Sequence, residues 1–152
     1  MPHLQIKARL RLLLFALICA SCTADEKILS INNSLIFNND QPQMAEALAA
    51  SGKHTLNWTA RTELGQTLQF QWDQGIDLDV NGQQTARNLI RQGGWTHVVL
   101  QEFSSRPLLE PELFFSAVRL FAAEVQTFCP GAKLLLFENW PYNTSANYSS
   151  LR

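Results

Sequence analysis

Apolar positions follow two kinds of pattern along the chain. Segments with the pattern of a strand alternate with segments that have the pattern of a helix. Runs that are apolar throughout, or that alternate strictly, predict four strands. They cover residues 27–32, 54–60, 97–101 and 132–137. Helical spacing or helix-forming composition, bounded by proline or glycine, predicts helices at residues 44–51, 85–92 and 111–128, with a short helical piece near 68–72.

Strands that alternate with helices predict an α/β protein. We expect a flavodoxin-like three-layer sandwich with a mostly parallel sheet and helices on both faces. No repeat, linker or low-complexity block interrupts residues 25–152, so this part is expected to form one domain. Ligand sites in such sheets lie at the carboxyl ends of the strands. The residues that follow each strand are therefore the first candidates for function.

The first 24 residues have the layout of an export signal. The basic residues Lys7, Arg9 and Arg11 precede the apolar residues 12–20, and small residues follow. A run of nine apolar residues is too short to span a bilayer, which needs about 20. We expect a signal peptide at residues 1–24 and an exported protein, either periplasmic or secreted.

Cys22 adds an alternative to free release. The residues before it, Ile18-Cys19-Ala20-Ser21, resemble the cleavage box of a bacterial lipoprotein, with Cys22 as the lipidated residue. A lipid on Cys22 would be the protein's one link to a membrane. Cys129 is the one cysteine within residues 25–152, so no disulfide framework is expected.

The charge balance argues against nucleic acid as a partner. The first 24 residues hold three basic and no acidic residues, so 9 basic and 13 acidic residues remain and the formal charge goes from −1 to −4. A mildly acidic domain is a poor binder of phosphate backbones. The sequence predicts no cofactor and does not predict an oligomeric state.

Two polar segments follow predicted strands at the same edge of the sheet. The first strand stops at Asn32-Asn33-Ser34, and a later strand ends at Gln101-Glu102. A serine hydroxyl at this edge can act as a nucleophile, and a side-chain amide can donate a hydrogen bond to a developing oxyanion. Taken singly, Ser34 also suits an ordinary turn, and Gln101 also suits a structural role.

Together these residues resemble the GDSL-type esterase and lipase family, also called SGNH hydrolases, over about residues 27–140. In that family a strand is followed by Gly-Asp-Ser or Gly-Asn-Ser, to which Asn32-Asn33-Ser34 is similar. The second block supplies a glycine and the third a side-chain amide. The resemblance implies Ser34 as the nucleophile, Gly65 and Gln101 as oxyanion-hole donors, and Asn33 and Glu102 as secondary candidates.

The chain departs from the family pattern in two places. Asn32 stands where the family has glycine. The family's last block, Asp-x-x-His, supplies the general base, and the sequence runs to Arg152 without it. We therefore expect a partial SGNH-like domain that is incomplete at its C-terminus and lacks the catalytic histidine.

The remaining candidates for a base lie at either edge of the predicted sheet. His54 and His97 each open a predicted strand, which puts them about 15 Å from Ser34 at ~3.3 Å per residue, so we assign them structural roles. Glu102 and Glu138 lie at the edge of Ser34. A carboxylate there would be a weak base toward a serine unless burial raised its pKa.

Residues 77–82 resemble the first half of an EF-hand calcium loop. Asp77, Asp79, Asn81 and Gly82 fill its first, third, fifth and sixth positions, but the twelfth, normally glutamate, is Asn88. We therefore predict a polar loop that caps the next helix, with calcium as the alternative, and no metal site elsewhere.

The export signal and the resemblance to SGNH hydrolases together imply an exported serine ester hydrolase. Its substrate would be a small-molecule, glycan or lipid ester. The alternative from another class is a non-catalytic, truncated or degenerate hydrolase-like protein that binds a ligand. A third interpretation is an unrelated flavodoxin-like domain that binds an anion at the helix after Ser34.

Overall fold

The computed structural model describes residues 25–37 and 40–138, which form one α/β unit around a parallel sheet. Across the sheet the strands follow the order β2-β1-β3-β4, and each neighbouring pair is parallel. The strands are β1 (Glu26–Asn32), β2 (Leu56–Thr62), β3 (His97–Leu100) and β4 (Lys133–Leu136). The predicted α/β sandwich with a parallel four-stranded sheet is therefore confirmed.

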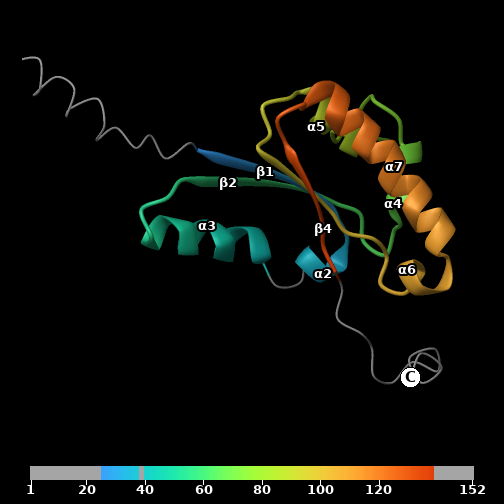
Figure 1. Cartoon of the computed structure of the whole chain (residues 1–152), viewed down its shortest axis with the longest axis horizontal. Helices are drawn as coiled ribbons and strands as arrows, with labels where there is room; N and C mark the ends of the chain where they lie inside the picture. The colour runs from blue at the N-terminus through green and yellow to red at the C-terminus, as the bar shows by residue number, and fades with distance from the viewer. Residues whose placement is uncertain (1–24, 38–39, 139–152) are drawn as a thin grey trace, which may run out of the picture.

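Helices cover both faces of this sheet (Figure 1). One face carries α3 (Gln41–Ser51), which packs along β2. The other carries α4 (Leu68–Asp73), α5 (Ala86–Arg91) and α7 (Pro111–Phe128). Two single-turn helices, α2 (Ser34–Phe37) and α6 (Arg106–Leu109), lie toward the carboxyl ends of the strands.

The apolar core lies between the sheet and the layer of α4, α5 and α7. Its sheet side consists of Leu29, Ile31, Val98 and Leu100, and its helix side includes Leu68, Ile90, Ala117, Phe121 and Val125. Phe121 is fully buried and meets Trp72 edge-on at 5.2 Å between ring centroids. Burial of such a side chain stabilises the fold by about 1.5–3 kcal/mol. On the opposite face of β1, the fully buried side chains Ser30 and Asn32 are polar.

Three local differences from the sequence prediction have simple causes. The second strand begins at Leu56, not at residue 54, because the N–H of His54 donates to the Ala49 carbonyl (2.9 Å) and prolongs the end of α3. The helix α3 begins at Gln41, with Pro42 in its first turn. The helices α2 and α6 have four residues each, too few to show a 3.6-residue period.

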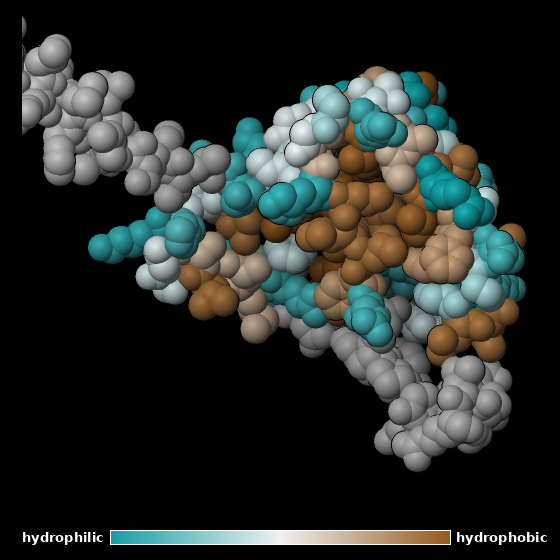
Figure 2. Space-filling model, in the orientation of Figure 1, coloured by the Kyte–Doolittle hydropathy of each residue, from teal (hydrophilic) through white to brown (hydrophobic). Residues whose placement is uncertain are grey.

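The outer strand β4 pairs with β3 alone among the described strands. Its side chains Leu135 and Leu136 are 46% and 50% exposed. Figure 2 shows a hydrophobic patch over β4 in the middle of this face of the molecule. An exposed apolar edge strand is a template for pairing with another chain.

Candidate active site

Ser34 lies directly beyond the carboxyl end of β1, at the first position of α2. Its side chain is half-buried. Within the described residues, neither its hydroxyl Oγ nor its backbone N–H has a hydrogen-bond partner. The first N–H groups of a helix have no acceptor inside that helix. Ser34 therefore presents both a hydroxyl and a donor N–H at this edge of the sheet.

Asn33 joins the end of β1 to the end of β3. Its backbone N–H donates to Oε1 of Gln101 (3.2 Å), and its side-chain Nδ2 donates to the backbone carbonyl of Glu102 (3.2 Å). Its Oδ1 accepts the N–H of Leu35 (3.3 Å), which caps α2. Asn33 and Gln101 are both buried, so these bonds are shielded from water. The first and third blocks of the predicted site thus lie side by side.

Asn32, which stands where the family has glycine, is fully buried in a polar cluster between β1 and β2. Its Nδ2 donates to Oγ of Ser30 (2.7 Å), and its Oδ1 accepts from the hydroxyl of Thr62 (2.6 Å). The indole of Trp58 donates to the same Ser30 oxygen (2.8 Å). The added side chain therefore has partners of its own, and β1 runs unbroken up to the turn before Ser34.

Gly65 occupies a tight turn just beyond β2. The N–H of Gln66 donates to the Glu63 carbonyl (3.2 Å), and Gly65 has a φ of 69°, a left-handed conformation that glycine adopts without strain. The N–H of Glu63 donates to the carbonyl of Asn32 (3.0 Å), which fixes the turn beside the end of β1. The N–H of Gly65 has no acceptor within the described residues.

Glu102 ties the second block to the third. Its buried Oε1 accepts the N–H of Phe103 (2.6 Å) and that of Leu68 (3.2 Å), three residues after Gly65. Burial raises the pKa of Glu102 above its ordinary value of 4.5, while the N–H groups of Phe103 and Leu68 act in the opposite direction. The Glu102 carboxylate thus makes internal hydrogen bonds, and its bond to Leu68 holds the backbone segment that follows Gly65.

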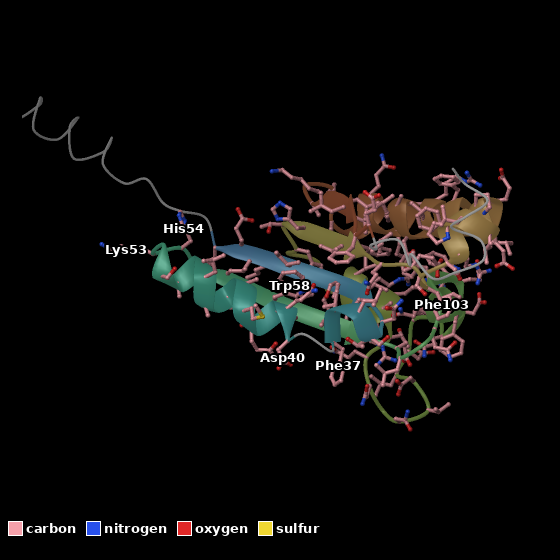
Figure 3. The ribbon with its side chains drawn as sticks, turned by 90° about the horizontal axis from the view of Figure 1, so that it is seen from below. Phe37, Asp40, Lys53, His54, Trp58 and Phe103 are labelled. Carbon is pink, nitrogen blue, oxygen red and sulfur yellow. The ribbon has the colours of Figure 1, made fainter. Side chains whose placement is uncertain are left out.

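The two described histidines lie at the amino ends of the strands, opposite Ser34. His97 is the first residue of β3, and its Nδ1 lies 3.2 Å from a carboxylate oxygen of Glu26. His54 follows α3 and is exposed, and Figure 3 shows it at the far end of that helix from Phe37, which belongs to α2. Neither histidine is placed to take a proton from Ser34, as their expected position at the opposite edge of the sheet implied.

A buried ionic cluster, centred on Arg61, lies at the end of β2. Arg61 is 5% exposed, and its guanidinium contacts the carboxylates of Glu63 and Asp79, the latter at 2.7 Å. Nη1 of the same guanidinium donates to Oε1 of Gln83 (2.8 Å). Two of its partners, Asp79 and Gln83, follow Arg61 by 18 and 22 positions, so no local pattern in the sequence could have revealed these contacts.

This cluster also decides the role of the calcium-like loop. One oxygen of Asp79 accepts the N–H groups of Asn81 (2.8 Å) and Gln83 (2.9 Å), and the other accepts from Arg61. The N–H of Gln83, together with Arg61 and Asn81, lowers the pKa of Asp79. Both oxygens therefore face donors rather than space for a cation. No group of three or more His, Cys, Asp or Glu within residues 25–37 and 40–138 could hold a metal ion.

Several predictions lie outside the described residues. The signal peptide at residues 1–24 and the lipidation candidate Cys22 are among them. The helices of the described part include none with the length and apolar character needed to cross a bilayer.

Comparisons with known proteins show a likeness in structure. No protein-family model matches the sequence, and no curated protein matches it. A proposed SGNH hydrolase from Slackia heliotrinireducens is similar with 25% identity and a TM-score of 0.60 over 84% of this chain and 64% of that one. A DUF4886 family protein from Bacteroides uniformis is similar in fold, with 14% identity and a TM-score of 0.65 over 84% of this chain and 56% of that one.

The chain thus spans less than two thirds of the length of either structure. In this chain, Ser34 lies at the carboxyl end of the strand β1 of the parallel sheet. The described residues have an SGNH-like fold.

Proposed function

We propose that this chain is an exported serine ester hydrolase of the SGNH type. The observation that carries the proposal is the pair of hydrogen bonds from Asn33 to Gln101 and Glu102, which hold Ser34 beside the end of β3. The SGNH-like fold supports the same interpretation of this edge. The substrate is an ester of a small molecule, glycan or lipid, and no nucleic acid takes part.

In this proposal Oγ of Ser34 attacks the acyl carbonyl carbon. The carbonyl oxygen becomes an oxyanion. It accepts hydrogen bonds from the backbone N–H groups of Gly65 and Ser34 and from the side-chain NH2 of Gln101. Collapse of the tetrahedral intermediate expels the alcohol and leaves an acyl-Ser34 ester. Attack by water then releases the acid and restores the serine, so one ester and one water give one acid and one alcohol.

The attack requires a base for the proton of Ser34. A base must lie within about 3 Å of that proton, directly or through one water, and His54 and His97 lie at the opposite edge. Glu102 is engaged with two backbone N–H groups. In this proposal the described residues serve as the nucleophile and the oxyanion donors, and a base added in solution would reveal their activity.

The test is hydrolysis of p-nitrophenyl acetate by the full chain and by Ser34→Ala, each with and without imidazole. Imidazole is a small base that also hydrolyses the ester unaided, and the Ser34→Ala protein measures this background. We expect wild type to exceed Ser34→Ala, with the difference growing as imidazole is added. Equal rates at every imidazole concentration would show that Ser34 is no nucleophile and favour a non-catalytic protein.

Export and anchoring are part of the proposal. Residues 1–24 would be removed as a signal peptide, or cleavage before Cys22 would leave a lipid-bearing cysteine at the new N-terminus. Expression in a bacterium followed by fractionation tests both. Membrane recovery that Cys22→Ala abolishes would support the lipid anchor, and recovery of full-length chain in the cytoplasm would contradict export.

A further inference from the structure

A cavity of about 320 Å³ opens beside the turn that carries Gly65. Three of its lining residues are apolar, namely Phe70 of α4, and Leu78 and Val80 of the following loop. Phe70 is 42% exposed and Val80 is fully exposed, so their apolar surfaces face solvent. The volume lies at the lower end of the range for small-molecule sites. The cavity therefore has room for one small ring.

The cavity is joined to the candidate active site through Glu63, which lines it. The N–H of Glu63 donates to the carbonyl of Asn32, two residues before Ser34, and Gly65 lies two residues after Glu63. Gln71, the buried residue that follows the lining residue Phe70 in α4, donates its side-chain amide to the same Asn32 carbonyl (3.1 Å). A group in the cavity would thus lie next to the proposed oxyanion hole, on the β2 side.

The polar lining is preorganised by the buried Arg61. This guanidinium binds the carboxylates of Glu63 and Asp79, and Asp79 in turn accepts two N–H groups of its own loop. Gln74 donates to Oε1 of Glu63 (2.9 Å), while Oε2 of Glu63 accepts no hydrogen bond within the described residues. Asn81 adds an exposed amide. Two carboxylates and one guanidinium leave a net charge of −1.

This combination suits a neutral, hydroxyl-rich ring better than an anion. The negative charge disfavours phosphates and carboxylates. The ring of Phe70 offers a flat surface for the C–H face of a sugar, and Glu63 and Asn81 offer partners for its hydroxyl groups. A quaternary ammonium group would usually be enclosed by several aromatic rings, and Phe70 is the one aromatic residue in this lining.

We propose that the cavity is a sugar-binding subsite, so that the ester cleaved at Ser34 is one borne by a carbohydrate. This inference rests on the proposed function for the link to Ser34, but the binding itself does not. The sugar ring would occupy the cavity while its ester group reaches the turn at Gly65.

Binding is tested with amide NMR spectra of the full chain, titrated with methyl glucoside, with N-acetylglucosamine and with tetramethylammonium chloride. We expect at least one of the sugars to shift the amides of residues 63–82 and leave those of the β4 region unchanged. Phe70→Ala should weaken this binding by about fivefold or more, which corresponds to about 1 kcal/mol. The matched control is Phe115→Ala, which removes a phenylalanine of similar exposure from α7.

Asn81→Ala provides a second variant that disturbs no hydrogen bond of its side chain within the described residues. We expect weaker sugar binding from it and no change from Asn57→Ala, an exposed asparagine of β2. The proposal is overturned if neither sugar shifts these amides, if Phe70→Ala binds as wild type does, or if tetramethylammonium alone binds.

The Ser34→Ala protein separates this inference from the proposed function. Sugar binding that persists in Ser34→Ala, together with no Ser34-dependent hydrolysis, would leave the subsite standing and reject the hydrolase. Ser34-dependent hydrolysis without sugar binding would support the hydrolase and reject the sugar subsite.

Discussion

The backbone N–H of Asn33 donates a hydrogen bond to Oε1 of Gln101, 3.2 Å away and out of contact with solvent. This bond joins two segments that are 68 positions apart in the chain. It also turns the oxygen end of the Gln101 amide toward β1. One side chain thereby holds the turn before Ser34 and contributes the donor that we assign to the oxyanion.

Gln101→Ala should impair both stability and catalysis. Loss of the acceptor for a buried N–H costs about 1–3 kcal/mol of unfolding free energy. Loss of one oxyanion donor lowers kcat about 10²- to 10³-fold. Urea unfolding and imidazole-assisted ester hydrolysis measure the two effects. Gln126→Ala, on an exposed position of α7, is the control. A Gln101→Ala protein with wild-type hydrolysis would exclude Gln101 as a donor.

Glu102→Gln should remove a pH dependence of stability. Burial raises the pKa of Glu102, so the folded chain holds this proton at pH values where the unfolded chain has released it. Its contribution to stability is therefore full below the ordinary pKa of 4.5 and is lost as pH rises through the higher folded-state pKa.

The amide oxygen that this substitution introduces can still accept the N–H groups of Phe103 and Leu68 without a buried charge. We expect urea midpoints of Glu102→Gln to equal or exceed those of wild type at pH 7 and to vary less between about pH 4.5 and pH 7. Glu112→Gln, in the first turn of α7, is the control. An unchanged pH profile in Glu102→Gln would show that Glu102 does not titrate in this range.

Asn32→Gly, which introduces the glycine of the SGNH pattern, should destabilise this protein. The change leaves Ser30 and Thr62 without the partner they share and adds backbone freedom to the unfolded chain. We expect a loss of about 2–3 kcal/mol in unfolding free energy. Asn57→Gly, at an exposed position of β2, should lose only about 0.5–1 kcal/mol. Equal losses in the two variants would show that the Asn32 side chain contributes nothing.

Leu135→Lys should reduce self-association. Leu135 is 46% exposed on the outer strand β4, where a charged side chain opposes edge-to-edge pairing. Light scattering during concentration measures self-association, which we expect to fall. Urea unfolding checks stability, and its midpoint should stay close to that of wild type. Phe115→Lys tests whether any added charge on an exposed apolar residue has the same effect. Equal improvement from both variants would contradict a specific role for β4.

The sequence was sufficient to predict the architecture, because strands of a parallel sheet and long amphipathic helices carry strong apolar patterns. The helix of residues 111–128 and the four strands are examples. The same patterns placed Ser34 and Gln101 at one edge of the sheet, as the structure has them. Their catalytic roles stay predictions.

The polar contacts of the site could not be predicted in this way. Asn32 is accommodated by Thr62, 30 positions away, and Glu102 accepts from Leu68, 34 positions away. Such pairs depend on strand register and on the path of each loop, which local spacing does not determine. The cavity beside Gly65 was missed for the same reason, since two of its lining residues, Glu63 and Asp79, are held by ion pairs with the buried Arg61.

Covalent labelling determines whether Ser34 is a nucleophile served by an oxyanion hole. The full chain is treated with a fluorophosphonate in the presence of imidazole, digested and mapped by mass spectrometry. Attack by Oγ on phosphorus displaces fluoride and leaves a stable phosphonate ester. We predict this adduct on Ser34 above any other serine, and none on the corresponding peptide of Ser34→Ala. An unlabelled Ser34, or labelling no greater than at other serines, would show that Ser34 is not an activated nucleophile.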